Sequence, residues 1–274
     1  MYTRPAAPRS IGGVLDDAVR LYQASFSRCW VLSLIGAALT GALGLYATLH
    51  LGVLTSPASK GLAGAVTAMA RIQRMEHSPR VWGSYLLVSL VWFVFRAAII
   101  ARQDAVAARR SDSNGQAAAY ALRRLPRIIV AGILFGVVIT VGMIIFVVPG
   151  IWLWGCLQLW LVALCVEDLG PFASFGRSWR LIEGNWWRTS ATVGVAIVLI
   201  LVLSLAESVL IGVVTAAVRP DPAVLLMTSQ IVGVALSVFT MPMLTAAMLA
   251  IFYDLKLRRE GGDLAARVSS LQPA

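Results

Sequence analysis

Charged side chains are scarce in this chain of 274 residues: they make up 13% of it, whereas 59% is hydrophobic. A soluble domain carries about 25% charged residues, so this scarcity excludes an ordinary soluble domain and indicates one membrane domain. Among the charges, 23 Lys and Arg outnumber 13 Asp and Glu. In a membrane protein such an excess is typical of loops that face anionic lipid, and we expect no nucleic-acid partner.

Cysteine and histidine are also rare. Cys29, Cys156 and Cys165 lie in or beside apolar segments, which excludes a disulfide framework. His50 and His77 have no carboxylate at metal-ligand spacing, so no metal site is predicted. The sequence also lacks a Ser nucleophile elbow, a P-loop and a Rossmann glycine fingerprint. We therefore expect no catalytic residues and no cofactor, and the chain is not predicted to be an enzyme.

Long apolar runs are abundant instead, and the clearest form a pair. Residues 128–148 are uncharged and apolar, Pro149 and Gly150 interrupt them, and residues 151–166 are apolar again. At 1.5 Å per residue the two runs extend roughly 31 and 24 Å, close to the bilayer core of about 30 Å. They predict a transmembrane hairpin with its corner at Pro149-Gly150, because Pro cannot continue a helix and Gly accepts the φ of a reversal.

Further apolar runs complete six predicted transmembrane helices. These lie at residues 30–50, 82–101, 128–148, 151–166, 190–214 and 225–253. They form one domain over residues 11–255, between a disordered tail (1–10) and a charged tail (256–274). Residues 51–81 carry too many charges to span, and we expect a loop there with a surface helix at 61–75. Pro242 is predicted to kink the last helix.

Amphipathic segments precede three pairs of these helices. In the segment that begins at Pro171, Phe172 and Phe175 lie on one side at helical spacing and Arg177 on the other, which suits a helix in the membrane interface. Residues 11–26 and the end of the loop 102–127 show similar patterns. We therefore predict an all-α integral membrane fold of three hairpins, each preceded by a cytoplasmic interfacial helix; convergent interface composition is the alternative explanation of the weak repeat.

The distribution of Lys and Arg predicts the orientation. With the N-terminus inside, the inner segments hold 17 of these residues and the outer segments hold 5. This positive-inside bias places both termini in the cytoplasm. The expected partners are the bilayer, the anionic lipids of the inner leaflet and a protein docked at the cytoplasmic face. The candidate lipid contacts are Arg20, Arg123, Arg124, Arg177, Arg180, Trp179, Trp186 and Trp187.

Charged or polar side chains inside the predicted spans are candidates for function because they are costly there. Arg96 lies roughly 9 Å from the inner end of its helix, a distance that its side chain covers by snorkelling. Glu207, flanked by Ser204 and Ser208, needs partners or a proton, and Gln230 lies at matching depth on the last helix. An interhelical hydrogen bond is the structural interpretation of Glu207, and a proton- or substrate-linked role is the functional one.

Several stretches resemble known families. FVVPGIW (146–152) and VALCVEDLGPFASFGRSWRLIEGNWWR (162–188) resemble the signature of the uncharacterised bacterial inner-membrane YciC-type family. They are also similar to the membrane domain of some glycerophosphoryl diester phosphodiesterases. The stretches IGGVLDDAVRLYQASF and FYDLKLRREGGDL resemble the two ends of that domain. The resemblance implies a six-helix bacterial inner-membrane protein with cytoplasmic termini. It does not imply phosphodiesterase activity, because a separate soluble domain does that chemistry.

Two functions fit the sequence. The first is a non-enzymatic membrane protein that interacts with lipid, organises the membrane or docks a partner. The alternative is a small permease or efflux component that uses Glu207 in a substrate or proton path. A path requires Glu207 to face a wet cavity, whereas the first function is compatible with Glu207 packed against the last helix.

Overall fold

The computed structural model describes residues 2–5, 7–51, 79–218 and 221–271, and this part of the chain contains helices and no strand. The helices are α1 (Ile11–Leu51), α3 (Pro79–Ala107), α4 (Asn114–Arg123), α5 (Leu125–Ile145), α6 (Val147–Leu157), α7 (Trp160–Val166), α8 (Pro171–Ile182), α9 (Trp186–Val218) and α10 (Pro222–Leu271). The predicted all-α class is confirmed. The predicted loop 51–81, with its surface helix, falls almost wholly outside the described residues.

Six helical stretches of the described chain are long and apolar enough to cross a membrane. They are Ile11–Ala47, Trp82–Ala107, Leu125–Ile145, Val147–Val166, Trp186–Val214 and Met227–Gly261. Each coincides with one of the six predicted spans. In sequence order they pair as α1 with α3, α5 with α6 and α7, and α9 with α10, and the members of each pair pack together. The helices α4 and α8 precede the second and third pairs, as predicted.

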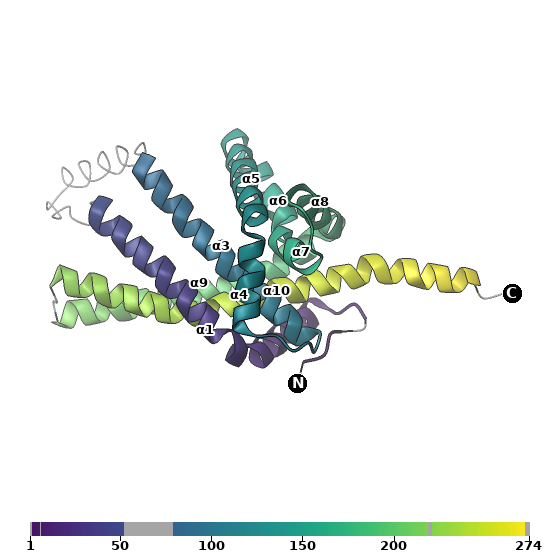
Figure 1. The fold of residues 1–274 in the computed structure, drawn as a ribbon, viewed down its shortest axis with the longest axis horizontal. Helices are drawn as coiled ribbons and strands as arrows, with labels where there is room; N and C mark the ends of the chain where they lie inside the picture. The colour runs from purple at the N-terminus through teal and green to yellow at the C-terminus, as the bar shows by residue number, and fades with distance from the viewer. Residues whose placement is uncertain (1, 6, 52–78, 219–220, 272–274) are drawn as a thin grey trace.

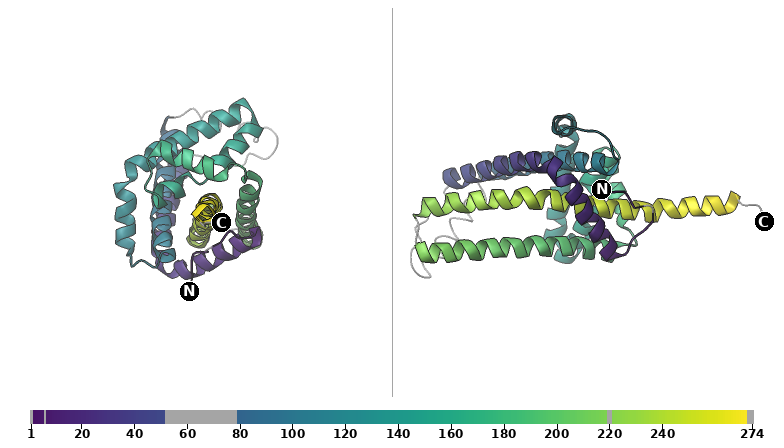
Figure 2. Two further views of the ribbon diagram at one scale, coloured as in Figure 1. Left: turned by 90° about the vertical axis from the view of Figure 1, so that its right-hand side faces the viewer. Right: turned by 90° about the horizontal axis from the view of Figure 1, so that it is seen from below.

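The last helix, α10, runs through the middle of the molecule. Seen along its axis, it is surrounded by the other helices (Figure 2, left), and it packs against α1, α3, α7, α8 and α9. Residues 246–255 are all buried there. The helix has 50 residues and continues past the body of the protein to Leu271 (Figure 1). The charged tail predicted at 256–274 is helical over residues 256–271, where it prolongs α10.

Neighbouring helices compensate for the proline inside α10. Pro242 has no N–H, so the carbonyl of Val238, four residues earlier, lacks its helical donor. The Ser33 hydroxyl of α1 donates to this carbonyl at 3.0 Å, and the Gln103 amide of α3 donates to the Pro242 carbonyl at 2.8 Å. Both bonds are buried, so α1 and α3 are attached to α10 at the proline.

The first helix is longer than predicted. Instead of an interfacial helix at 11–26 and a span at 30–50, α1 is one helix of 41 residues. Its first part crosses the bundle obliquely, and the helix then turns to run beside α9 and α10 (Figure 2, right). At 1.5 Å per residue it extends about 60 Å, twice the bilayer core, so a continuous helix contains both predicted parts.

The corner of the second hairpin differs from its prediction. The chain leaves the helical conformation at Phe146, with φ −156° and ψ 133°, and Pro149 and Gly150 lie in the first turn of α6. Pro suits a first turn because its missing N–H would have no helical acceptor there. A Cβ on Gly150 would lie 2.8 Å from the backbone nitrogen of Met143 on α5. Gly150 is therefore needed for close packing of the two arms rather than for the reversal.

The second arm of this hairpin is interrupted, and α8 packs along the interruption. The predicted helix 151–166 is divided between α6 and α7. The buried Ser178 of α8 donates to the Cys156 carbonyl at 2.8 Å and accepts from the Leu159 N–H at 3.2 Å. One hydroxyl thus satisfies the two backbone groups that the interruption exposes.

Candidate functional site

The clearest concentration of polar contacts surrounds α10 where it leaves the body of the protein. We call it the charged collar. Its members on α10 are Tyr253, Asp254, Lys256, Arg258, Arg259 and Glu260, and their partners are Arg4, Arg9, Asp104, Glu167, Arg177, Glu183 and Arg188. The partners come from the N-terminal segment, α3, the α7–α8 connection, α8, the α8–α9 connection and α9. The collar therefore joins six separate parts of the chain to one helix.

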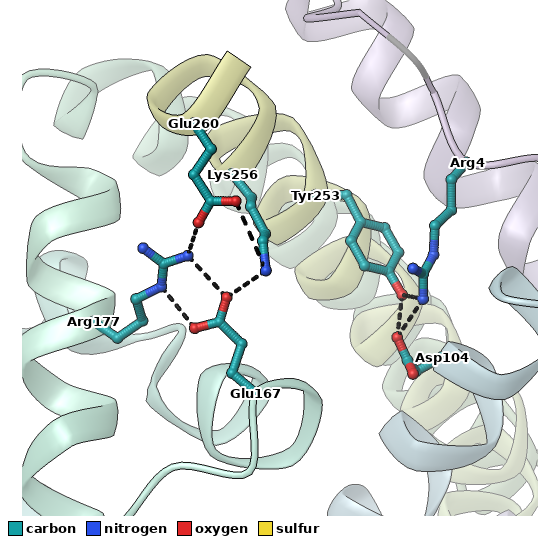
Figure 3. Close-up of polar contacts among 7 residues, drawn as sticks. All are labelled: Arg4, Asp104, Glu167, Arg177, Tyr253, Lys256 and Glu260. Carbon is teal, nitrogen blue, oxygen red and sulfur yellow. Dashed lines mark hydrogen bonds and ion pairs between the residues drawn. The ribbon is translucent and has the colours of Figure 1, made fainter. Parts of the chain in front are cut away.

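The first group of the collar is centred on Asp104 of α3 (Figure 3). The Tyr253 hydroxyl donates to its Oδ1 at 2.5 Å, and the Arg4 guanidinium donates to the same oxygen at 2.7 Å. Arg4 also lies over the Tyr253 ring, 4.6 Å from its centroid. Arg110 binds the other oxygen, Oδ2. The side chain of Asp104 is almost buried, and these donors stabilise its negative charge there.

The second group is centred on Asp254 of α10. Its Oδ1 accepts the backbone N–H of Arg9 at 2.8 Å, and its Oδ2 accepts from Arg258 at 2.9 Å and from Arg188 of α9 at 3.3 Å. Arg188 and Arg258 also donate to the backbone carbonyl of Arg9. The N-terminal segment is thereby fixed, and the nearby Tyr2 is only 4% exposed. The segment 1–10 was predicted to be a disordered tail, and in the structure these bonds attach its described part to α9 and α10.

The third group links α8 to α10 through Glu167 (Figure 3). Arg177 binds both carboxylate oxygens, at 2.7 and 2.8 Å, and Lys256 binds Oε1 at 2.7 Å. Glu260 accepts from Arg177 at 2.5 Å. Burial by itself raises the pKa of Glu167, but the hydrogen bonds from Arg177 and Lys256 outweigh it and the pKa lies below its usual range. The bond to Glu167 raises the pKa of Arg177, so both charges persist at neutral pH.

A polar pocket of about 460 Å³ lies beside the first group, between the end of α3, α4 and the end of α7. Arg110, Tyr120, Arg124 and Asp168 are among its lining residues. Arg124 lies over the Tyr120 ring at 3.7 Å from the centroid and binds Asp168. Within the described residues no three His, Cys, Asp or Glu side chains gather as metal ligands. The lining arginines thus bring positive charge and hydrogen-bond donors to the pocket.

The predicted lipid contacts divide into two sets. Arg20, Arg123 and Arg180 are exposed, and Trp187 is 82% exposed. The side chains of Arg124 and Arg177 are only 19% and 17% exposed, because each is held by a carboxylate.

The other two tryptophans pack against α6. The Trp179 ring lies 4.9 Å from that of Trp152, and the Trp186 Nε1 donates to the Trp152 carbonyl at 3.2 Å. In the predicted hairpin Trp152 stands at the corner, whereas Trp179 and Trp186 follow the far end of the span 151–166, yet these contacts bring the three together. The reason is that α8 folds back along α6 and α7 instead of lying beyond their end.

The structure does not bring the three predicted intramembrane residues together. The guanidinium of Arg96 lies over the Trp92 ring, 4.3 Å from its centroid, so it is directed back along α3 and not towards the end at Ala107. Its Nε has no hydrogen-bond partner within the described chain. On α9, the Glu207 carboxylate lies 3.7 Å from where a Cβ on Gly233 of α10 would be. Gln230 is half-buried one turn earlier on α10.

Sequence reasoning missed the acidic members of the collar. Asp104, Glu167 and Asp254 each follow a predicted span, at 82–101, 151–166 and 225–253, within three residues of its end. With the predicted topology these three span ends lie on the same side of the membrane. This regularity was a usable signal, because a carboxylate at a membrane surface rich in arginine is expected to bind the arginines around it.

The chain belongs to the family described as "Domain of unknown function (DUF7847)", whose family model matches residues 19–255. No curated protein and no solved structure matches the chain. The matched range includes every hairpin and ends just after Asp254, so it takes in most of the collar's carboxylates.

Proposed function

We propose that this protein is a non-enzymatic, multi-pass protein of the bacterial inner membrane that gathers anionic lipid, and docks a protein partner, at its cytoplasmic face. The observation that carries the proposal is that each amphipathic segment before a hairpin keeps one arginine exposed: Arg20 in α1, Arg123 in α4 and Arg180 in α8. The side chains of the other two predicted arginines, Arg124 and Arg177, are mostly buried and do not face the surface. The three exposed arginines are therefore available to external anions.

Exposed apolar side chains accompany these arginines. Val19 (52% exposed) adjoins Arg20, and Leu122 (59%) adjoins Arg123. On α8, Phe172 is 74% exposed. A basic side chain beside an exposed apolar one suits the boundary between headgroups and acyl chains, and each arginine near an anionic surface contributes about 1 kcal/mol of attraction.

The test is the ratio of anionic to zwitterionic lipid that copurifies with the protein, measured by mass spectrometry. The triple variant Arg20→Gln, Arg123→Gln, Arg180→Gln should lower this ratio several-fold, because each substitution removes about 1 kcal/mol of attraction, or roughly fivefold, at its own position. Arg80→Gln is the control, since Arg80 is exposed at the opposite end of α3 from Asp104. An unchanged ratio in the triple variant, or an equal fall in the Arg80→Gln protein, contradicts the proposal.

The role of Glu207 separates this function from the permease alternative. Its contact with Gly233 supports packing between α9 and α10. We expect Glu207→Gln to leave cell growth and the copurified lipid ratio unchanged, since a neutral amide of the same size keeps that packing. Loss of accumulation or efflux of a solute in Glu207→Gln cells, with normal protein levels, is the result that favours a permease.

A further inference from the structure

The polar pocket between α3, α4 and α7 has an excess of positive charge once its ion pairs are counted. Asp104 is bound by Arg4 and Arg110, and Asp168 is bound by Arg124 and Arg127. Asp112 faces Arg102 at 3.9 Å. All three aspartates line the pocket, but only two of the five arginines do, Arg110 and Arg124. Arg4, Arg102 and Arg127 pair with these aspartates from outside the lining, so the whole cluster keeps a net charge of +2. This net charge of the cluster attracts an anion towards Arg110 and Arg124.

The aspartates hold the two lining arginines in place. Asp104 binds one Nη of Arg110 at 2.5 Å, and the side chain of Arg110 is otherwise 65% exposed. Asp168 binds Nε and Nη2 of Arg124, whose guanidinium is also fixed over the Tyr120 ring. Each guanidinium keeps further N–H donors, because arginine has five. Fixed arginines lose little side-chain entropy when they bind a ligand, which favours affinity.

Two further features lie at or beside the same pocket. Asp168, which lines it, and Arg109, which is outside the lining but adjoins Arg110, have φ of 53° and 54°, and they are the non-glycine residues with positive φ in the described chain. Such strained backbone gathers at binding sites. The Tyr120 hydroxyl donates to the Cys165 carbonyl, and burial raises the pKa of Tyr120, so the phenol stays neutral beneath Arg124. The volume of about 460 Å³ is that of a small-ligand pocket.

We propose that this pocket binds the phosphate group of a phosphate ester, with Arg110 and Arg124 as its ligands. Phosphate matches the planar donor geometry of two guanidinium groups, and a single ester anion offsets the net charge of the cluster. The proposal rests on the proposed function in one respect, namely that α4 lies at the level of the lipid headgroups. The phosphate ester is either the headgroup of an anionic lipid or a small soluble phosphate ester.

The experiment measures binding to the full-length protein in neutral detergent, without a bilayer. The probes are dihexanoyl phosphatidylglycerol and sn-glycerol 3-phosphate, and glycerol is the phosphate-free control. The affinities are compared for the wild type, Arg110→Gln, Arg124→Gln and Arg109→Gln. Arg109→Gln makes the same charge change in the neighbouring residue, which does not line the pocket.

We expect at least one phosphate probe to bind the wild type and Arg109→Gln alike, and to bind Arg110→Gln and Arg124→Gln on the order of tenfold more weakly. Binding of the lipid probe alone assigns a headgroup site, and binding of glycerol 3-phosphate assigns a soluble ester. Should Arg124→Gln fail to fold, Arg110→Gln carries the comparison, because its side chain is largely exposed.

The proposal is overturned if neither probe binds the wild type, or if Arg109→Gln weakens binding as much as Arg110→Gln. Arg20, Arg123 and Arg180 are intact in all of these variants, so such a failure leaves the copurified-lipid experiment untouched. Conversely, a lipid ratio that does not respond to the triple variant, together with tight binding in the pocket, contradicts the proposed function and leaves the phosphate site standing.

Discussion

The hydroxyl of Ser33 occupies an unusual place, because it supplies the donor that Pro242 cannot. The Val238 carbonyl is buried inside the bundle and has this hydroxyl, on another helix, as its partner. A buried acceptor that loses its partner costs about 1–3 kcal/mol. Most other hydroxyls in the spans, such as Ser208, donate to a carbonyl of their own helix, which already has a backbone donor.

We therefore predict that Ser33→Ala lowers the free energy of unfolding by about 1–3 kcal/mol. Ser208→Ala, which removes an exposed hydroxyl bonded to Ser204, should change it by less than about 0.5 kcal/mol. The measurement is equilibrium unfolding in mixed micelles of mild detergent and dodecyl sulfate. Equal effects of the two substitutions would show that the Val238 carbonyl does not depend on Ser33.

Gly150 gives a second prediction, about packing. A Cβ at this position would lie 2.7 to 2.8 Å from the Met143 side chain and its backbone nitrogen, so the arms of the hairpin must separate. Gly150→Ala should destabilise the protein by about 1–3 kcal/mol, visible as a lower thermal midpoint in detergent. Gly136→Ala is the matched control on α5, because nothing lies within 4 Å of its added Cβ. A midpoint for Gly150→Ala equal to that control would contradict the close approach.

Among the helices, the relation of α8 to α10 depends on one carboxylate. The pKa of Glu167 in the folded protein is below its ordinary value of 4.5. The stability that Glu167 contributes is therefore complete above pH 4.5 and is lost as the pH falls through the lower, folded-state pKa. Below that pH the carboxyl is protonated and cannot bind Arg177 and Lys256 as an anion.

This predicts that wild type and Glu167→Gln differ in unfolding free energy at pH 6 and converge as the pH falls through the lowered pKa of Glu167. Glu183→Gln should follow the wild-type curve, because the Glu183 side chain is exposed and its contact with Arg259 uses the backbone carbonyl. Unfolding free energies over this pH range provide the measurement. A constant difference between wild type and Glu167→Gln across the range would rule out the linkage.

Helix by helix, the sequence predicted the spans far better than their surroundings. Apolar runs of bilayer length are easy to recognise in a sequence, because the lipid environment requires apolar side chains along nearly the whole run. An amphipathic pattern is less informative, because a polar face can meet water, headgroups or another helix. Arg177 and Arg180 occupy the same polar face in the sequence, yet Arg177 binds Glu167 and Glu260 while Arg180 is exposed. Only the position of α10 decides between them.

Corners and breaks were predictable only in part. Pro149-Gly150 lies near the corner but within the first turn of α6, and the chain leaves the helical conformation at Phe146. The interruption between α6 and α7 has no signal in residues 157–160 themselves, since it is stabilised by Ser178 from another helix. The capping box of α4, by contrast, is local: Ser113 and Gln116 exchange side-chain and backbone bonds within four residues, so its signal lies in adjacent residues of the sequence.

For the molecule as a whole, the membrane topology is the untested prediction on which the others depend. Single cysteines at Ser59, Ser113 and Ser269, placed in a cysteine-free background, should differ in their reaction with an impermeant thiol reagent on intact cells. We expect labelling at position 59 alone, because the positive-inside count places residues 113 and 269 in the cytoplasm. Removing the native Cys29, Cys156 and Cys165 is feasible since all three are buried and unpaired. Labelling at 113 reverses the orientation and moves the collar to the outer face.

The length of α10 has a mechanical consequence. A helix of 50 residues is a rod of about 75 Å, and a proline would ordinarily make it bend at that point. Here Ser33 of α1 and Gln103 of α3 hold the backbone carbonyls of Val238 and Pro242, which restricts bending of α10 at the proline. A protein that binds the projecting end of α10 is therefore connected through a continuous helix to the α9–α10 hairpin. A force applied to α10 outside the bilayer is therefore transmitted to the helices inside the bilayer. The ion pairs of the charged collar oppose such a movement and must break before α10 can move.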